Sequence, residues 1–309
     1  MAITPKEIQA LREATGAGMM DCKKALVETE GDMDKAIDIL RKKGIATAEK
    51  KSGRIAAEGA CYAAVCESCG SASIVEINSE TDFSAKSDAF QAFIKGVTEV
   101  IYTENPKDVD ELKQKLYLNT GRTVGETLQD KILAIGENIQ IRRLGYYGDA
   151  VNAAYVHMGG KIAVLVHMDT DDGLKNNPAV VELGREVAMQ IAAMRPLCLD
   201  RSALRQEDID KEREIYAEQL KQDPKNSSKP AAVLEKIVDG RIGKYYSEVC
   251  LLEQAFVKDN KLTVGKYVEQ KAKELGGKIV VTDFVRFEKG EGLAKREDDF
   301  AAEVARMQG

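Results

Sequence analysis

The sequence ACYAAVCESCGSASIVEINSETDFSAKSDAFQAFIKGVTEVIY, residues 60–102, decides the fold of this chain. Its pattern changes to a period of two at Ala60, which predicts strands at Ala60–Glu67 and Ser73–Asn78 joined by a tight turn. A polar turn at residues 79–82 then leads into a helix that we expect to run to about Tyr102. The apolar side chains of that helix have the spacing of one buried face: Phe90, Phe93, Ile94 and Val97.

A similar order of elements returns in the second half of the chain. Strands are expected at Ala153–His157 and Lys161–Met168, followed by a polar turn and a helix from about Pro178 to Met194. A later strand at Lys278–Glu288 should rejoin this second sheet. Two related α+β halves are therefore predicted. The first half is completed by two helices and a strand, at Val109–Leu118, Leu128–Glu137 and Asn138–Tyr147.

The first 45 residues predict a small unit of three helices. The first helix opens with a capping box and a proline in its first turn, provided by Thr4, Glu7 and Pro5. The third helix is expected to be capped by Asp32 and to end at Gly44, which would be its C′ residue. The Lys-rich residues 46–56 are expected to form a linker that is helical at most in part.

The remaining segments are helical in pattern. Residues 202–248 consist of two charged helical stretches around a polar break, which predicts a helical hairpin projecting from the second half. A helix from Thr263 to Leu275 and a charged C-terminal helix at Arg296–Met307 complete the chain. We therefore predict an α+β protein in four parts: a three-helix domain with its linker at 1–55, a first core subdomain at 56–145, a second core subdomain with the inserted hairpin at 146–290, and a C-terminal module at 291–309.

Charge and hydropathy exclude several classes of partner. The net charge is −6, whereas bulk nucleic-acid binding needs a basic field that releases counterions from phosphates. Direct nucleic-acid binding is therefore not expected, and the basic run between Arg41 and Arg54 is interpreted as a solvated linker. No stretch approaches 18 uninterrupted apolar residues, so no membrane span is expected. The N-terminus lacks the pattern of a signal peptide, which favours a cytoplasmic protein.

The six cysteines give no metal site by spacing. In a cytosolic chain they should be reduced thiols. Cys66 and Cys69 form one CxxC, but a zinc site would need further ligands and the chain has only two histidines, His157 and His167. We therefore predict no metal and no cofactor.

The motifs of common enzymes are missing as well. There is no GxxxxGK[ST] phosphate loop, no HExxH and no nucleophile elbow. The protein is therefore predicted not to be an enzyme. Three surface features remain. Met19-Met20 suits either a recognition surface or the core of the three-helix unit. Phe83 in Thr81-Asp82-Phe83-Ser84 should be buried either under its own helix, which the residues alone favour, or in a partner, and His157 stands at a hairpin tip.

These features occur in the order found in one known family. Residues 11–26, LREATGAGMMDCKKAL, closely resemble the N-terminal signature of the elongation factor Ts family. Residues 76–86, EINSETDFSAK, resemble the second signature of that family. Residues 135–139, the His157 hairpin and residues 286–292 match as well, so the resemblance covers essentially the whole chain.

The resemblance implies a fold and a function. The N-terminal unit would be a ubiquitin-associated-like domain, the middle a two-part α+β core with antiparallel sheets, the hairpin a coiled coil, and the last helix a docking module. The partner would be the GTPase elongation factor Tu, from which the factor releases GDP without catalysing covalent chemistry. Whether the hairpin dimerises stays open.

The resemblance also implies the contact residues. Asp82 and Phe83 match the pair that is inserted near the magnesium site of the partner, within the segment Thr81–Ser84. The family usually has valine at the position of Ser84. A later stretch, Thr282-Asp283-Phe284-Val285, has the valine that the family usually has, but it stands in an alternating strand, so we interpret it as structural. Further contacts with the partner are implied for Arg12, Met19, Met20 and Lys23, which would touch the GTPase domain. Ile135 and Gly136 would be a further contact made by the core of this protein, and His157 would touch a second domain of the partner.

Two other classes of function compete with this hypothesis. A binding adaptor could use the three-helix unit to hold ubiquitin-like partners without exchange activity, which would leave the Phe83 tip and the His157 hairpin without a role. An enzyme with an unrecognised carboxylate site would need a deep pocket with converging acids. An exchange factor should instead be elongated, with its contacts along one side.

Overall fold

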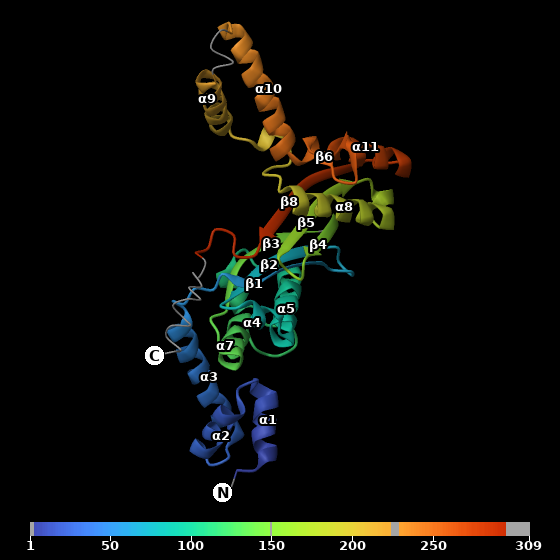
Figure 1. The fold of residues 1–309 in the computed structure, drawn as a ribbon. Helices are drawn as coiled ribbons and strands as arrows, with labels where there is room; N and C mark the ends of the chain where they lie inside the picture. The colour runs from blue at the N-terminus through green and yellow to red at the C-terminus, as the bar shows by residue number, and fades with distance from the viewer. Residues whose placement is uncertain (1–2, 149, 224–228, 295–309) are drawn as a thin grey trace.

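The computed structural model describes residues 3–148, 150–223 and 229–294. It is elongated, with the N-terminal helices at one end, two stacked sheets in the middle and a helical hairpin at the other end (Figure 1). Within the described residues, helices combine with purely antiparallel sheets, which confirms the predicted α+β class.

The first sheet has the order β1-β2-β3, formed by Glu58–Val65, Ala72–Ser79 and Gln140–Tyr147. The helix α5, Asp88–Glu104, covers its outer face. Every residue of β2 is buried, because the second sheet covers the other face. The core between α5 and the sheet is built on the predicted stripe of Phe90, Phe93, Ile94 and Val97.

The second sheet has the order β4-β5-β8, formed by Val151–His157, Ile162–Thr170 and Ile279–Glu288. Pairing of β8 with β5 confirms that the last strand rejoins this sheet. The outer face is covered by α8, Pro178–Met194, and α11, Val264–Leu275. Sequence analysis did not predict the small hairpin of β6, Ala255–Phe256, and β7, Asp259–Thr263.

The two sheets pack face to face through small and branched side chains. Ala63, Ile74 and Leu165 belong to the apolar cluster between them. A buried ionic cluster continues this contact at one edge. The fully buried carboxylate of Glu76 accepts hydrogen bonds from Arg142 Nη1 at 3.0 Å, from Arg143 Nε at 2.6 Å and from the backbone N–H of Gly290 at 2.8 Å. Because Gly290 follows β8, this cluster ties the first sheet to the segment that leaves the second.

The N-terminal unit contains α1, Pro5–Thr15, α2, Met19–Glu28, and α3, Met33–Lys51. The capping box of Thr4 and Glu7 is confirmed. The predicted end of the third helix at Gly44 is wrong, because α3 continues to Lys51 through most of the expected linker.

Close packing explains the glycine inside α3. A Cβ atom on Gly44 would lie 3.6 Å from the carbonyl oxygen of Gln129, in the helix α7, Val124–Ile135. The side chain of Arg41 on the same helix also pairs with Glu126 of α7. Gly44 therefore permits close approach of two helices, and the contact with α7 keeps residues 45–51 helical.

Gly44→Ala is expected to raise the free energy of unfolding by about 0.5–1 kcal/mol, because alanine has the higher helix propensity and its methyl group finds ordinary contact distance. Gly44→Leu should lower it, because the larger side chain would force α3 away from α7. Urea unfolding of the two variants measures both changes. A loss of stability in Gly44→Ala would instead indicate a left-handed cap.

Three further helices differ in their bounds from the predictions. The helix α7 runs from Val124 to Ile135 instead of from Leu128 to Glu137, because a capping box of Thr123 and Glu126 starts it one turn earlier. The helix expected to run unbroken to Tyr102 is divided into α4, Asp82–Lys86, and α5, because extended Ser87 caps α5 through a hydrogen bond from the N–H of Phe90. The helix α6, Val109–Gln114, is shorter than predicted. Residues beyond it form an isolated bridge, Leu116 with Thr123, and Leu118 adopts a positive φ.

The predicted hairpin is present as α9, Gln206–Gln222, and α10, Ala231–Val249. It projects from the second sheet, away from the N-terminal helices (Figure 1). Three 3-10 turns complete the described elements, namely η1 at Asp172–Leu174, η2 at Arg201–Ala203 and η4 at Leu251–Glu253. The expected C-terminal helix at 296–307 lies outside the described residues. None of the helices described here is long and apolar enough to cross a membrane.

Candidate partner-binding surface

An exposed phenylalanine stands at the junction of the first sheet and its helices. The chain leaves β2, turns at Glu80, and starts α4 with Thr81 as its N-cap, whose side chain accepts the N–H of Ser84. Phe83, in the first turn of this short helix, is 84% exposed. Burial under its own helix, which the residues alone favoured, is therefore wrong. An aromatic side chain held this far into solvent is available to a partner.

Glu137 fixes the start of this helix from a distant part of the sequence. Its carboxylate accepts the Thr81 N–H at 3.0 Å and the Thr81 hydroxyl at 2.7 Å. The Glu80 carboxylate accepts the N–H of Asn138 at 2.7 Å in return. These reciprocal bonds join residues 80–81 to residues 137–138. The backbone that presents Phe83 is therefore held on both sides although its side chain touches little.

Asp82 lies beside Phe83 and is exposed. It pairs with Lys86 one turn later at 2.6 Å. The hydrogen bond from Lys86, followed by the attraction of its charge, lowers the pKa of the Asp82 carboxyl. Asp82 is therefore an anion at neutral pH, and its counterion is an exposed side chain that can move away.

The remaining member of the segment, Ser84, is buried. Its carbonyl oxygen accepts a hydrogen bond from the Ser87 hydroxyl at 2.7 Å, which helps to end α4. Ser84 and Ala85 face inward while Asp82 and Phe83 face outward. The segment thus separates supporting residues from exposed ones.

Ile135 and Gly136 lie next to this tip, as the C-terminal end of α7. Gly136 adopts a left-handed conformation with φ of 83° and directly precedes Glu137, which holds Thr81. The ammonium group of Lys51, at the end of α3, donates to the carbonyl oxygen of Gly136. Two predicted contact sites that are far apart in sequence are therefore neighbours.

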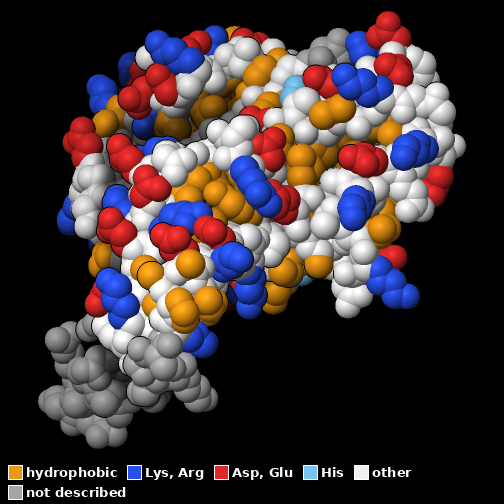
Figure 2. Space-filling view, turned by 90° about the horizontal axis from the view of Figure 1, so that it is seen from above, with side chains coloured by type: hydrophobic (Ala, Val, Ile, Leu, Met, Phe, Trp, Pro, Cys, Tyr) orange, Lys and Arg blue, Asp and Glu red, His pale blue; other side chains and the backbone are white. Residues whose placement is uncertain are grey.

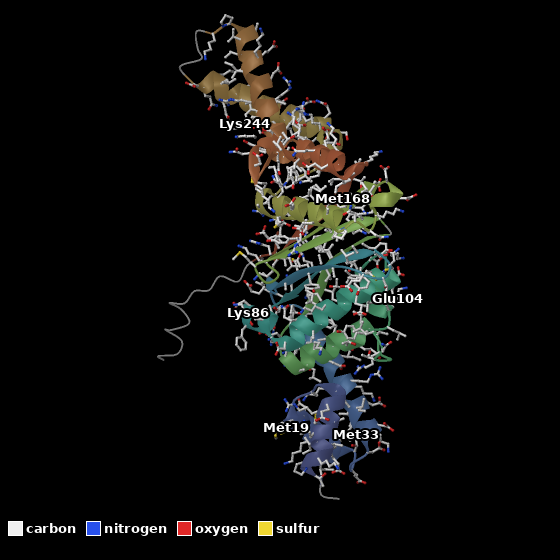
Figure 3. All side chains as sticks on the ribbon, turned by 90° about the vertical axis from the view of Figure 1, so that its right-hand side faces the viewer. Met19, Met33, Lys86, Glu104, Met168 and Lys244 are labelled. Carbon is white, nitrogen blue, oxygen red and sulfur yellow. The ribbon has the colours of Figure 1, made fainter. Side chains whose placement is uncertain are left out.

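The four predicted contacts of the N-terminal unit form a separate exposed group on α1 and α2. All of them are exposed: Arg12, Met19, Met20 and Lys23. The core of the unit is built from other residues, such as Leu11 and Leu26, so the alternative that Met19 and Met20 fill it is wrong. In Figure 3, Met19 and Lys86 lie along the same edge of the molecule, and Glu104 lies on the opposite edge.

His157 ends β4 at the tip of the second sheet and is half-buried. Its Nδ1 atom lies 2.9 Å from the hydroxyl of Tyr155. Gly160 in the same turn packs on β1, because its carbonyl oxygen accepts the N–H of Cys61 at 2.8 Å. Met158, which sequence analysis did not single out, is the most exposed apolar side chain of this tip. The Thr-Asp-Phe-Val stretch at residues 282–285 lies within β8, as predicted.

Comparison with known proteins identifies the family of this chain. The family model described as "Elongation factor TS" matches residues 80–291, which include the Phe83 tip and the His157 turn. The chain belongs to the elongation factor Ts family.

The similarity to curated members of the family extends over the full length of the chain. Elongation factor Ts of Clostridium perfringens (strain 13 / Type A) is 46% identical over 309 residues, and that of Syntrophotalea carbinolica is 47% identical over 309 residues, each covering 99% of both chains. Elongation factor Ts of Trichlorobacter lovleyi is 45% identical over 314 residues, covering 100% of this chain and 99% of its own. The chain is thus one of the translation elongation factors.

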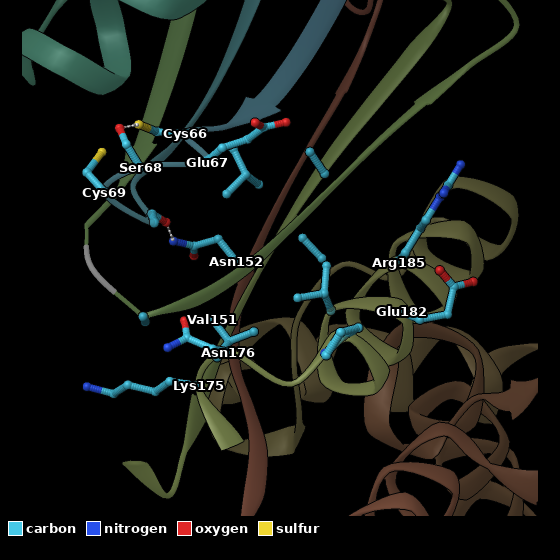
Figure 4. Close-up of a pocket in the computed structure, with 17 residues that line it drawn as sticks. Cys66, Glu67, Ser68, Cys69, Val151, Asn152, Lys175, Asn176, Glu182 and Arg185 are labelled. Carbon is cyan, nitrogen blue, oxygen red and sulfur yellow. Dashed lines mark hydrogen bonds between the residues drawn. The ribbon is translucent and has the colours of Figure 1, made fainter. Parts of the chain in front are cut away.

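A groove lies elsewhere in the chain, between the β1–β2 turn and α8 (Figure 4). It has a volume of about 990 Å³. Two acids, Glu67 and Glu182, are among its lining residues, accompanied by Lys175 and Arg185. In Figure 4 Glu67 comes from the β1–β2 turn and Glu182 from α8, on different walls of the groove.

Charged side chains of both signs are interspersed on the face of the molecule that Figure 2 shows. Among residues 3–148, 150–223 and 229–294, no group of three or more His, Cys, Asp or Glu side chains could hold a metal ion. Sequence reasoning missed Glu137 as the residue that fixes the tip. The only signal was an acid directly after a helix-ending glycine, and its partner lies 56 positions earlier.

Proposed function

We propose that this protein is a guanine-nucleotide exchange factor for elongation factor Tu. It would bind the GDP-bound GTPase and promote GDP release by disturbing the magnesium and phosphate site. The observation that carries this proposal is the exposed Phe83 on a backbone fixed by Glu137. Such a side chain can enter a partner at no cost in folding free energy, and family membership points to translation elongation.

Burial of Phe83 in the partner could supply the required energy. A phenylalanine buries about 150–250 Å², which at roughly 25 cal/mol per Å² is worth up to about 4–6 kcal/mol. Each 1.4 kcal/mol directed into distortion of the nucleotide site corresponds to about a tenfold loss of nucleotide affinity. Because coupling between two ligands is reciprocal, GDP or GTP would in turn weaken the binding of the factor and release it.

Asp82 would act on the magnesium site beside the phosphates. Mg²⁺ requires near-ideal octahedral geometry, so a small displacement of its surroundings weakens it sharply. The ionised Asp82 side chain has a mobile partner in Lys86 and could turn towards cationic groups of the GTPase. No covalent step is needed, which agrees with a factor that is not an enzyme.

The other predicted sites would provide docking affinity. Arg12, Met19, Met20 and Lys23 would contact the GTPase domain, with the three helices acting as a ubiquitin-associated-like domain. Ile135 and Gly136 would extend the contact around the tip, and His157 would touch a second domain. The C-terminal residues 291–309 would add a docking helix, and the hairpin would act as a coiled coil. This function needs no cofactor, and it would be carried out in the cytoplasm.

Binding to two nucleotide states of the partner tests the proposal. Calorimetry should give tighter binding to nucleotide-free elongation factor Tu than to the GDP-loaded form, by at least about tenfold, because an exchange factor must favour the empty site. A ubiquitin-associated-like adaptor without exchange activity would bind both forms equally. Equal affinities would therefore reject the exchange proposal in favour of the adaptor.

Glu137→Ala should slow GDP release by about five- to tenfold, because a Thr81 backbone that Glu137 no longer holds would use about 1–1.4 kcal/mol of the binding free energy to become ordered. The rate of release of a fluorescent GDP analogue measures the change. Amide exchange at Ser84 should rise in the same variant while global unfolding changes little. Glu137→Gln retains one acceptor oxygen and should lie between the two proteins. A full rate in Glu137→Ala would mean that the tip needs no such support.

A further inference from the structure

Two cysteines meet where the helical hairpin leaves and rejoins the second subdomain. Cys198 precedes α9 and Cys250 follows α10, and their Sγ atoms lie 3.7 Å apart. Both residues belong to short connecting segments that pair as an isolated parallel bridge. The hairpin is thus closed at its base by a pair of facing thiols.

Backbone hydrogen bonds hold these segments in register. The N–H of Leu197 donates to the carbonyl oxygen of Val249 at 2.8 Å, and the N–H of Leu251 donates to that of Cys198 at 2.9 Å. Paired strands lie about 4.7–4.9 Å apart, which falls within the Cα separation of about 4.4–6.8 Å found in disulfides. Closing the remaining gap between the sulfurs therefore needs side-chain rotation more than backbone movement.

We propose that Cys198 and Cys250 form a reversible disulfide that staples the base of the α9–α10 hairpin, with a low-molecular-weight disulfide such as oxidised glutathione as the oxidant. The reaction proceeds in two exchanges. The Cys198 thiolate attacks one sulfur of the small disulfide, forming a mixed disulfide and releasing one small thiolate. Cys250 then loses its proton and attacks Cys198 Sγ, releasing the second. Two protein thiols are oxidised, and one small disulfide is reduced to two thiols.

Access decides the order of these steps. Cys198 is half-buried and lines an open groove of about 440 Å³, whereas Cys250 is fully buried. Burial raises the pKa of both thiols, and that of Cys250 to about 12. Cys198 is therefore the side chain that meets the oxidant, and the neighbouring sulfur resolves the mixed disulfide. Because both thiolates are scarce at neutral pH, the reaction should be slow and should quicken as the pH rises.

A second pair of cysteines would compete with Cys198 and Cys250 for the oxidant. Cys66 and Cys69 share the β1–β2 turn (Figure 4), and hydrogen bonds from Cys69 and then from Ser68 lower the pKa of the Cys66 thiol to about 7. This pair should oxidise sooner, but it joins residues of one turn. The Cys198–Cys250 bond would instead join two segments that are far apart in sequence, and so would restrain opening of the whole hairpin.

The full-length Cys66→Ser/Cys69→Ser protein is the reference for the test, because it removes the competing pair. It is incubated with oxidised glutathione, alkylated and digested, and hydrogen exchange is followed on the undigested protein. The expected result is a Cys198–Cys250 linked peptide that reducing agent removes. Amide exchange at Leu197 and Leu251 should be at least about tenfold slower in the oxidised protein, because the bridge opposes local opening.

Adding Cys198→Ser to this reference is the matched control. It alters the half-exposed thiol, leaves the buried one in place, and should abolish both the linked peptide and the slower exchange. A mixed disulfide that stays at Cys198, a disulfide between two molecules, or unmodified thiols after prolonged oxidation would each overturn the proposal. These readouts do not involve a GTPase, so they stand or fall separately from the exchange function.

Discussion

Phe83→Ala should slow the release of GDP from elongation factor Tu by at least about thirtyfold, since truncating a buried aromatic anchor costs about 2 kcal/mol or more. The stability of the free protein should hardly change, because Phe83 is 84% exposed and contributes little to its own core. The rate is measured as the loss of a fluorescent GDP analogue at a fixed concentration of the variant and of Mg²⁺.

The size of this effect follows from the position of the side chain. Phe83 projects from a short helix whose start is held by Glu137 through Thr81, so little ordering remains to be done on binding. The free energy of its burial can therefore go into distorting the nucleotide site of the partner, rather than into ordering residues 81–84. Without the ring, docking through the other predicted contacts would persist, but the side chain that is inserted near the magnesium site would be lost.

Phe284→Ala is the matched control, because Phe284 also follows a Thr-Asp pair but stands within β8. It packs against the second core, so its truncation should lower stability and leave exchange intact below the unfolding transition. Equal rates of GDP release for wild type and Phe83→Ala would reject the role of Phe83 in exchange. A loss of exchange in Phe284→Ala alone would move the site to the second sheet.

Glu76→Ala should destabilise the fold by about 3 kcal/mol, in the range observed when one partner of a buried ion pair is removed. The carboxylate of Glu76 is fully buried and holds two arginines and one backbone N–H. Its removal would leave Arg142 and Arg143 facing each other without the shared anion. The midpoint of urea unfolding is the appropriate measurement.

The cost should appear at the junction between the sheets. Arg143 Nη2 also donates to the carbonyl oxygen of Glu288, at the end of β8, at 3.2 Å. Amide exchange at Gly290 should therefore increase before the outer helices open. Glu76→Gln, which keeps the shape of the side chain, should lose less stability. Glu235→Ala, at an exposed position of α10, is the control for removal of an acid. No difference between Glu76→Ala and this control would contradict the role of the ionic cluster.

Local signals were sufficient for most elements of the fold. The change to a period of two at Ala60 predicted the first hairpin, and the same pattern predicted β4, β5 and β8. The capping box at Thr4 and the cap at Thr263 located helix starts, because those signals act within one turn of the chain.

A long-range contact at Gly44 and a local cap at Ser87 account for two of the wrong boundaries. Gly44 has the residue type of a helix end, yet packing against Gln129 uses it inside a helix. Ser87 interrupts a periodic apolar pattern because its hydroxyl caps the next helix and bonds the previous one. The position of Gly44 inside a helix cannot be read from neighbouring residues, because its partner Gln129 is distant in sequence. The cap at Ser87 lies within three residues of both partners, and is a local signal that sequence analysis missed.

Some features of the candidate site could also be predicted from the sequence, whereas others depend on the three-dimensional structure. The family signatures identified Thr81–Ser84, but only the structure decides between the two positions open to Phe83 and between the two open to Met19 and Met20. Glu137 could be found only in three dimensions, because its role depends on bringing the end of α7 to the start of α4. Exposure and support are properties of packing, so they do not follow from the motif.

The most direct test of the exchange function is the rate of GDP release from elongation factor Tu with and without the intact protein. The partner is loaded with a fluorescent GDP analogue, chased with excess GDP at fixed Mg²⁺, and mixed with increasing amounts of the factor. We expect release to accelerate strongly with factor concentration, and to accelerate less as Mg²⁺ rises. Release at the spontaneous rate, over concentrations at which the two proteins are shown to bind, would contradict the proposed function.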